Sequence, residues 1–132
     1  MTASANLDLV RSIYADWERG DFSRADWADP EIEYVVTDGP DAGVYRGLER
    51  LARFLRGVLS HMADGRNTAE GYRELDDGRI FAVDRLTGRG RSTGLQGEIP
   101  AARVFEIRAG KVSRITVYTD RDRALADLGL EE

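Results

Sequence analysis

The sequence predicts an α+β fold, because helical and strand-like segments are segregated along the chain. Apolar residues recur at helical spacing in Leu7–Trp17 and again in Leu48–Met62. Beyond Gly65 the pattern changes to four consecutive strand-like segments separated by glycine-containing turns. Helices followed by successive strands favour an antiparallel sheet over a parallel, doubly wound one. The 132 residues suit a single domain, 1–132, with a sizeable core.

The N-terminal third is expected to hold one helix and one strand. Asn6 is a suitable N-cap for the first helix, and Arg19-Gly20 ends it. A short turn or helix near Ser23–Trp27 stops at Asp29-Pro30. Residues 31–36 alternate as a half-buried strand does, and a loop from 37 to 46 follows.

The remaining elements are a long helix, four strands and a short helix. The long helix has one apolar stripe, formed by Leu48, Leu51, Leu55, Val58 and Met62. The strands are expected at Asn67–Leu75, Arg79–Gly90, Glu98–Arg108 and Lys111–Thr119. Asp120 is expected to cap a last helix over Arg121–Leu128, which Gly129 closes.

Composition excludes several classes of function. The net charge of -5 and the pI of about 5.0 disfavour a nucleic-acid partner. No apolar run approaches the roughly 20 residues of a membrane span, and the N-terminus lacks a secretory signal, so a cytoplasmic protein is expected. The chain has no cysteine and only one histidine, His61, which excludes thiolate and multi-histidine metal sites. We therefore expect neither a metal nor a cofactor.

Three segments carry a family resemblance: Tyr45-Arg46-Gly47 before the long helix, the hairpin Val104–Val112, and the run 118–130. In this order, from Leu7 to Leu130, the chain resembles the SnoaL-like family of the nuclear transport factor 2-like superfamily, which is related to steroid delta-isomerases and polyketide cyclases. The resemblance implies a cone-shaped, curved antiparallel sheet wrapped by helices around a pocket. The family also includes epoxide hydrolases, dehydratases and members with no known activity, so it does not choose a reaction.

The sheet register predicts which residues share the pocket. A two-residue turn at Ala109-Gly110 places Arg103 opposite Thr116, and a turn near Thr93 places Val83 opposite Arg103. One face then carries Phe81, Val83, Arg85, Thr87, Arg103, Phe105, Thr116 and Tyr118. The other carries Ile80, Ala82, Asp84, Leu86, Ala102, Val104, Glu106, Ile115 and Val117. One face is expected to line the pocket and the other to pack on a second subunit in a homodimer.

Four of these residues form a candidate anion-binding group: Arg85, Arg103, Thr116 and Tyr118. Guanidinium and phenol groups can hold a carboxylate or stabilise an enolate, and Phe105 would line the same face. The alternative is that the arginines form structural ion pairs with glutamates. The first choices for stabilising an oxyanion are Arg103 and Tyr118.

Three residues compete for the role of general base: Asp84, Glu33 and His61. Asp84 interrupts an apolar strand, and its alternative role is a salt bridge to an arginine. His61, on the flank of the long helix, is either a base at the pocket rim or a surface residue. Glu33 or Asp38 would replace the aspartate base of the steroid isomerases that the chain resembles.

Three aromatic residues are candidate ligand contacts: Tyr14, Trp17 and Tyr34. Tyr14 matches by position the first-helix tyrosine of those isomerases, although Tyr14 and Trp17 could simply be core residues. The epoxide-hydrolase members use an Asp-Arg-Asp set, to which Arg85 could contribute. Thr87 and Val117 stand where the aspartates belong, which argues against epoxide hydrolysis.

The sequence as a whole predicts a pocket protein for a small hydrophobic or carboxylate-bearing molecule. If it is an enzyme, we expect a cofactor-independent isomerase, cyclase or lyase that transfers a proton next to a carbonyl. The alternative is a non-catalytic binding or scaffold protein of the same fold.

Overall fold

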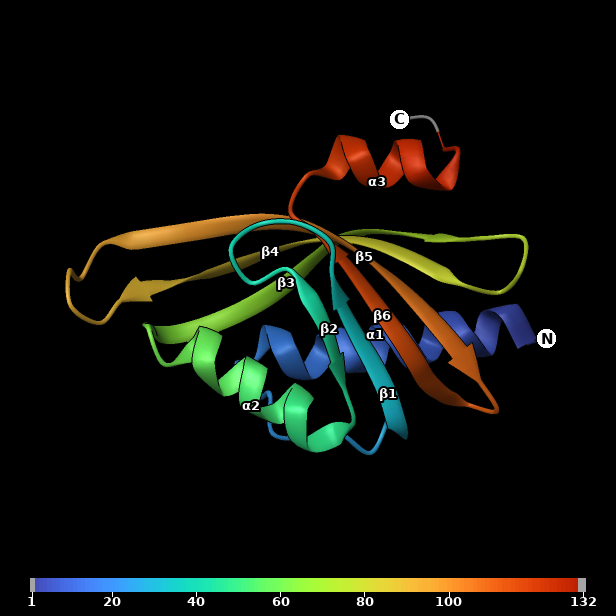
Figure 1. The fold of residues 1–132 in the computed structure, drawn as a ribbon, viewed down its shortest axis with the longest axis horizontal. Helices are drawn as coiled ribbons and strands as arrows, with labels where there is room; N and C mark the ends of the chain where they lie inside the picture. Colours follow the sequence, from blue (N-terminus) through green and yellow to red (C-terminus); the bar gives the residue numbers. More distant parts are fainter. Residues whose placement is uncertain (1, 131–132) are drawn as a thin grey trace.

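The computed structural model describes residues 2–130, which form one curved sheet and three helices (Figure 1). In chain order the elements are α1 (Thr2–Glu18), β1 (Ala28–Val36), β2 (Gly43–Arg46), α2 (Leu48–Leu59), β3 (Met62–Glu74), β4 (Ile80–Gly90), β5 (Gln96–Arg108), β6 (Lys111–Tyr118) and α3 (Arg121–Leu128). The predicted α+β class is confirmed. No helix within this described range is long and apolar enough to cross a membrane.

The six strands lie in the order β2-β1-β6-β5-β4-β3. Neighbouring strands are antiparallel except β1 and β6, which run parallel. This parallel pair places β1, the strand predicted in the N-terminal third, beside β6, the last strand of the chain. Two local expectations are wrong: β2 forms within the predicted loop, and Asn6 lies inside α1, which begins at Thr2, instead of capping it. Ser23–Trp27 contains a turn, one of the two forms predicted for it.

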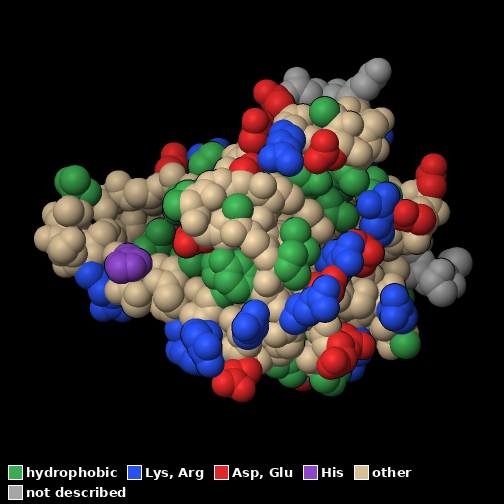
Figure 2. Space-filling view, in the orientation of Figure 1, with side chains coloured by type: hydrophobic (Ala, Val, Ile, Leu, Met, Phe, Trp, Pro, Cys, Tyr) green, Lys and Arg blue, Asp and Glu red, His purple; other side chains and the backbone are tan. Residues whose placement is uncertain are grey.

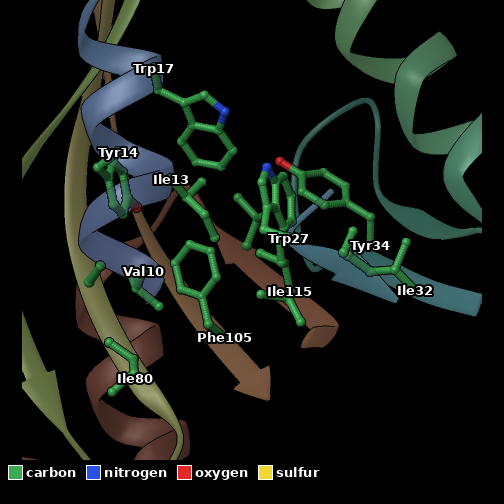
Figure 3. Close-up of a cluster of buried hydrophobic side chains, with 14 of the residues drawn as sticks. Val10, Ile13, Tyr14, Trp17, Trp27, Ile32, Tyr34, Ile80, Phe105 and Ile115 are labelled. Carbon is green, nitrogen blue, oxygen red and sulfur yellow. The ribbon is translucent and has the colours of Figure 1, made fainter. Parts of the chain in front are cut away.

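Helices α1 and α2 lie on one side of the sheet and α3 on the other (Figure 1). The buried residues of α1 recur at three- and four-residue spacing and contact the sheet through Phe105 and Ile115 (Figure 3). These residues of α1 are Val10, Ile13, Tyr14 and Trp17. The main core therefore fills the space between α1 and the concave face of the sheet.

Helix α2 is shorter than predicted. It ends at Leu59, and Met62 begins β3, so the stripe Leu48–Met62 spans a helix and the start of a strand. His61 therefore lies in the exposed turn between them and not on the flank of the helix.

Helix α3 has the predicted bounds and caps. The Asp120 side chain accepts a hydrogen bond from the Arg123 backbone N–H, and Gly129 adopts the left-handed conformation with φ 68°. Ala124 is buried against a second cluster on the outer face of the sheet, formed with Phe81, Ala102, Val104 and Tyr118. Part of the outer face is thus covered within one chain.

The predicted register is wrong by one residue on each side of β5. The turn at Ala109-Gly110 pairs Arg108 with Lys111 as expected, but a bulge at Ser113 then pairs Arg103 with Val117 instead of Thr116. In β4, Ala82 rather than Val83 lies opposite Arg103. Since a one-residue slip exchanges the faces of a strand, Arg103 moves to the face of Asp84 and away from Arg85, Thr116 and Tyr118.

Candidate functional site

A pocket of about 180 Å³ opens between α2, the β1–β2 loop and the concave face of the sheet. Most of its wall is apolar, and α2 contributes two residues of the predicted stripe, Leu55 and Val58, together with Phe54 and Leu59. The lining residues used below are Trp17, Tyr34, Asp38, Asp41, Asn67, Asp84 and Arg103. A pocket of this size holds several waters or a small organic molecule.

The deepest polar group is an ion pair between β4 and β5. Arg103 Nε lies 3.2 Å from Asp84 Oδ2, and the two side chains are 11% and 1% exposed. Asp84 and Arg103 share this face because Ala82 lies opposite Arg103 in the observed register. The prediction that placed them on opposite faces is wrong.

Tyr14 contacts the Asp84 carboxylate from the side of the core, away from the pocket. Its hydroxyl donates a hydrogen bond to Asp84 Oδ2. Burial, and secondly the Asp84 charge, raise the pKa of the Tyr14 phenol well above its ordinary value. The phenol therefore stays protonated and remains a donor. Tyr14 fixes the carboxylate from behind and does not itself line the pocket.

Arg103 is a permanent cation in this site. Burial has the largest single effect and acts to lower the pKa of its guanidinium. The Asp84 carboxylate, together with the hydroxyl groups of Tyr34 and Tyr14, outweighs that effect and raises the pKa above its ordinary value. The guanidinium carbon also lies 5.7 Å from the centre of the Trp17 ring, on the pocket wall.

Several polar atoms at this end of the pocket have no hydrogen-bond partner. Among the described residues, the buried side-chain atoms without one are Asn67 Oδ1, Asp84 Oδ1, Arg103 Nε and Arg103 Nη1. All four belong to residues that line the same pocket. Buried polar groups are almost always paired in proteins, so this concentration marks a place where a ligand would supply the partners.

The aromatic candidates lie at different depths. Trp17 and Tyr34 line the pocket, whereas Phe105 packs against Tyr14 in the core with ring centres 5.9 Å apart. Figure 3 shows the Tyr34 hydroxyl directed toward the tryptophans of the core. Burial raises the pKa of Tyr34, so it too stays protonated.

The rim of the pocket is acidic. The β1–β2 loop contributes Asp38 and Asp41. Asp38 accepts hydrogen bonds from the backbone and hydroxyl of Thr119, which lower its pKa against an opposing effect of burial. These bonds tie the loop to the end of β6.

The other predicted site residues lie outside the pocket. Glu33 is paired with Arg46 and Arg114 on the outer face, and these arginines hold its pKa low. Arg85 forms ion pairs with Glu70 and Glu98. Thr116 and Tyr118 are on the outer face, where Tyr118 packs in the cluster under α3, and His61 is exposed (Figure 2).

Asn67 was missed by sequence reasoning. It lies among polar residues in β3 and is 2% exposed. Nothing in its local pattern distinguishes it from the solvent-facing residues beside it. Its burial follows from the contact of β3 with β4 and α1.

The described residues, 2–130, contain no group of three or more histidine, aspartate or glutamate side chains placed to hold a metal ion. The chemistry that these residues offer at the pocket floor is that of a carboxylate, a guanidinium and an amide.

Residues 10–115 match the SnoaL-like domain family, and the chain belongs to that family. An uncharacterized protein of Mycobacterium tuberculosis is 31% identical over 122 residues, which cover 89% of this chain and 91% of that protein.

Solved structures share the fold at low sequence identity. A protein from a soil-derived mobile gene cassette has a TM-score of 0.77 and 21% identity, covering 89% of this chain and 90% of the other. A nuclear transport factor 2-like protein of unknown function from Burkholderia pseudomallei has a TM-score of 0.75 and 19% identity, with 92% and 95% covered. TerC, co-crystallized with polyporic acid, has a TM-score of 0.74 and 19% identity, with 94% and 97% covered.

Proposed function

We propose that this SnoaL-like protein binds a small, mostly apolar carbonyl compound and transfers a proton next to the carbonyl without a cofactor. The observation that supports this most directly is the unpartnered pair of Asp84 Oδ1 and Arg103 Nη1 at the floor of an apolar pocket. A carboxylate oxygen can accept a proton from carbon, and a guanidinium beside it can stabilise the oxygen charge that develops.

The proton transfer conserves charge within the pocket. The C–H bond next to the carbonyl breaks, an O–H bond forms at Asp84 Oδ1, and the electron pair moves onto the carbonyl oxygen as an enolate. Arg103 then faces the enolate in place of the aspartate. Return of the proton to another carbon gives an isomer. Alternatively, the enolate carbon attacks a second carbonyl and closes a ring, and the proton on Asp84 passes to the alkoxide that this attack creates.

The test uses 2-tetralone, an apolar bicyclic ketone with acidic protons next to its carbonyl. In heavy water the protein is expected to accelerate exchange of these protons for deuterium, followed by NMR. The Asp84→Asn variant keeps the shape and the acceptor for Tyr14, and is expected to lose the acceleration by about 100-fold or more. Binding of 2-tetralone, read from tryptophan fluorescence because Trp17 lines the pocket, shows whether the variant is still folded.

His61→Gln is the matched control, because His61 is another of the predicted bases and lies exposed in a turn. Its exchange rate is expected to equal that of the wild type. Equal rates for Asp84→Asn and the wild type would contradict the proposal.

A non-catalytic binding protein is the second candidate. It is favoured by the ion pair itself, because a carboxylate that serves only to neutralise and orient Arg103 needs no free access to a carbon acid. Tight binding of 2-tetralone with no accelerated exchange would support this candidate over the enzyme.

A further inference from the structure

We infer that the pocket selects an electrically neutral ligand whose polar end both donates and accepts hydrogen bonds, such as a hydroxy-carbonyl or an amide, and discriminates against a carboxylate. This inference rests on the proposed function, because it names the class of ligand that would undergo the proton transfer in the same pocket. It also replaces the expectation of a carboxylate-bearing molecule, which came from placing Arg85 and Arg103 together.

The first argument is the charge of the pocket floor. Arg103 is already neutralised by Asp84 at 3.2 Å. The remaining charged residues of the lining are Asp38 and Asp41, so the described lining holds three carboxylates and one guanidinium. A ligand carboxylate would enter an apolar enclosure with no cation left to pair with it, and an unpaired buried charge is costly.

The second argument is the set of unpartnered atoms. Asp84 Oδ1 and Asn67 Oδ1 accept hydrogen bonds, whereas Arg103 Nε and Nη1 donate them. A carboxylate satisfies only the donors and repels the two acceptor oxygens. A group with one donor and one acceptor satisfies both kinds of atom at once.

The third argument assigns specificity to Asn67. Its side chain is 2% exposed, lines the pocket, and has an oxygen without a partner. A ligand that donates a hydrogen bond pairs this oxygen, while a ligand that only accepts leaves it unpaired. Buried acceptors left unpaired in this way discriminate between otherwise similar ligands.

The experiment compares three ligands of the same shape by isothermal titration calorimetry at a pH where the acid is ionised. 2-Naphthamide is neutral and both donates and accepts, 2-acetylnaphthalene only accepts, and 2-naphthoate is an anion. The wild type is expected to bind 2-naphthamide about tenfold or more tightly than 2-naphthoate, with 2-acetylnaphthalene weaker than the amide. Asn67→Leu is expected to abolish the preference for the amide over 2-acetylnaphthalene.

The Asp84→Asn variant is expected to reverse the order of the ligand affinities. It leaves Arg103 as the uncompensated cation of the floor, so 2-naphthoate is expected to bind more tightly than 2-naphthamide. His61→Gln, outside the pocket, is expected to keep the wild-type order.

Preference of the wild type for 2-naphthoate, an unchanged order in Asp84→Asn, or no binding of any of the three ligands would overturn the inference. Exchange of 2-tetralone is read separately. If the protein accelerates exchange but prefers 2-naphthoate, the inference about the ligand is wrong and the proposed reaction stands. A preference for neutral ligands without exchange would overturn only the proposed reaction.

Discussion

Asp84 and Arg103 depend on each other because each is buried in apolar surroundings that would penalise its charge alone. Hydrogen bonding of the pair is incomplete within the protein. Asp84 Oδ1 and Arg103 Nη1 have no hydrogen-bond partner, and Arg103 Nε, 3.2 Å from Asp84 Oδ2, forms an ion pair but no hydrogen bond. Buried ion pairs of this kind contribute little net stability. In the proposed function, the pair at the floor of the pocket therefore serves the ligand and not the stability of the fold.

The Tyr14 hydroxyl gives the site a predictable response to alkaline pH. Burial, and then Asp84, raise the pKa of Tyr14 above its ordinary value of 10.0, so the folded chain keeps a phenol proton that the unfolded chain releases. The contribution of Tyr14 to stability is therefore fully present below pH 10 and is lost as the pH rises above it. Tyr14→Phe is expected to make stability less dependent on pH in this range.

Urea unfolding of both proteins between neutral and strongly alkaline pH measures this difference. At neutral pH the variant is expected to be about 2 kcal/mol less stable, since it loses a hydrogen bond to a charged group. The other buried tyrosines leave the variant with some alkaline sensitivity. Parallel curves for the two proteins would contradict the assignment.

At the residue scale, the sequence identified most residues of the site but not which of them lie together in one pocket. Asp84, Arg103, Trp17 and Tyr34 were all candidates, and the structure brings them to one pocket. Their association depends on register, which residue identities alone do not determine. Asn67 could not be singled out, because its burial arises from contacts with distant segments.

At the element scale, helix ends were predictable where a local signal existed. Asp120 and Gly129 mark the two ends of α3. A carboxylate N-cap and a left-handed glycine both end a helix through contacts with neighbouring residues, which the sequence shows directly. The bulge at Ser113 has no comparable signal, and that single inserted residue was enough to reverse the predicted face of Arg103 relative to β6.

The cap of α3 supports a stability prediction. Asp120→Ala removes the acceptor for the Arg123 N–H and is expected to cost about 1 kcal/mol in urea unfolding. Asp122→Ala is the matched control in the same first turn, because Asp122 is exposed and is not the N-cap residue. An equal loss for both variants would show that charge at the helix start, and not the cap bond, is responsible.

At the scale of the whole molecule, charges of both signs are interspersed over the face seen in Figure 2. The predicted homodimer would use the outer face of the sheet, yet α3 covers the apolar cluster around Phe81 and Val104. Beyond α3 this face carries ion pairs, such as Arg114 with Glu33. A dimer through this face would therefore rest on charged groups.

Such a dimer is expected to weaken as ionic strength rises, because salt screens exposed charges. Sedimentation equilibrium at low and high ionic strength measures this. The expected mass at low salt is twice the 14.7 kDa of one chain, declining toward a single chain as salt is added. A mass of 14.7 kDa at low salt would contradict the homodimer.

The parallel pairing of β1 with β6 also governs when the protein can fold. Glu33 and Arg114, which meet across this pair, are 81 positions apart, so β1 has no neighbouring strand except β2 until the last strand has been synthesised. Closing so long a segment slows folding, toward the millisecond-to-second range of topologies rich in distant contacts. On the ribosome the edge of β1 that pairs with β6 stays unpaired until almost the entire chain has been made. The cavity, which Val117 of β6 helps to line, is therefore completed only at the end of biosynthesis, when β6 pairs with β1.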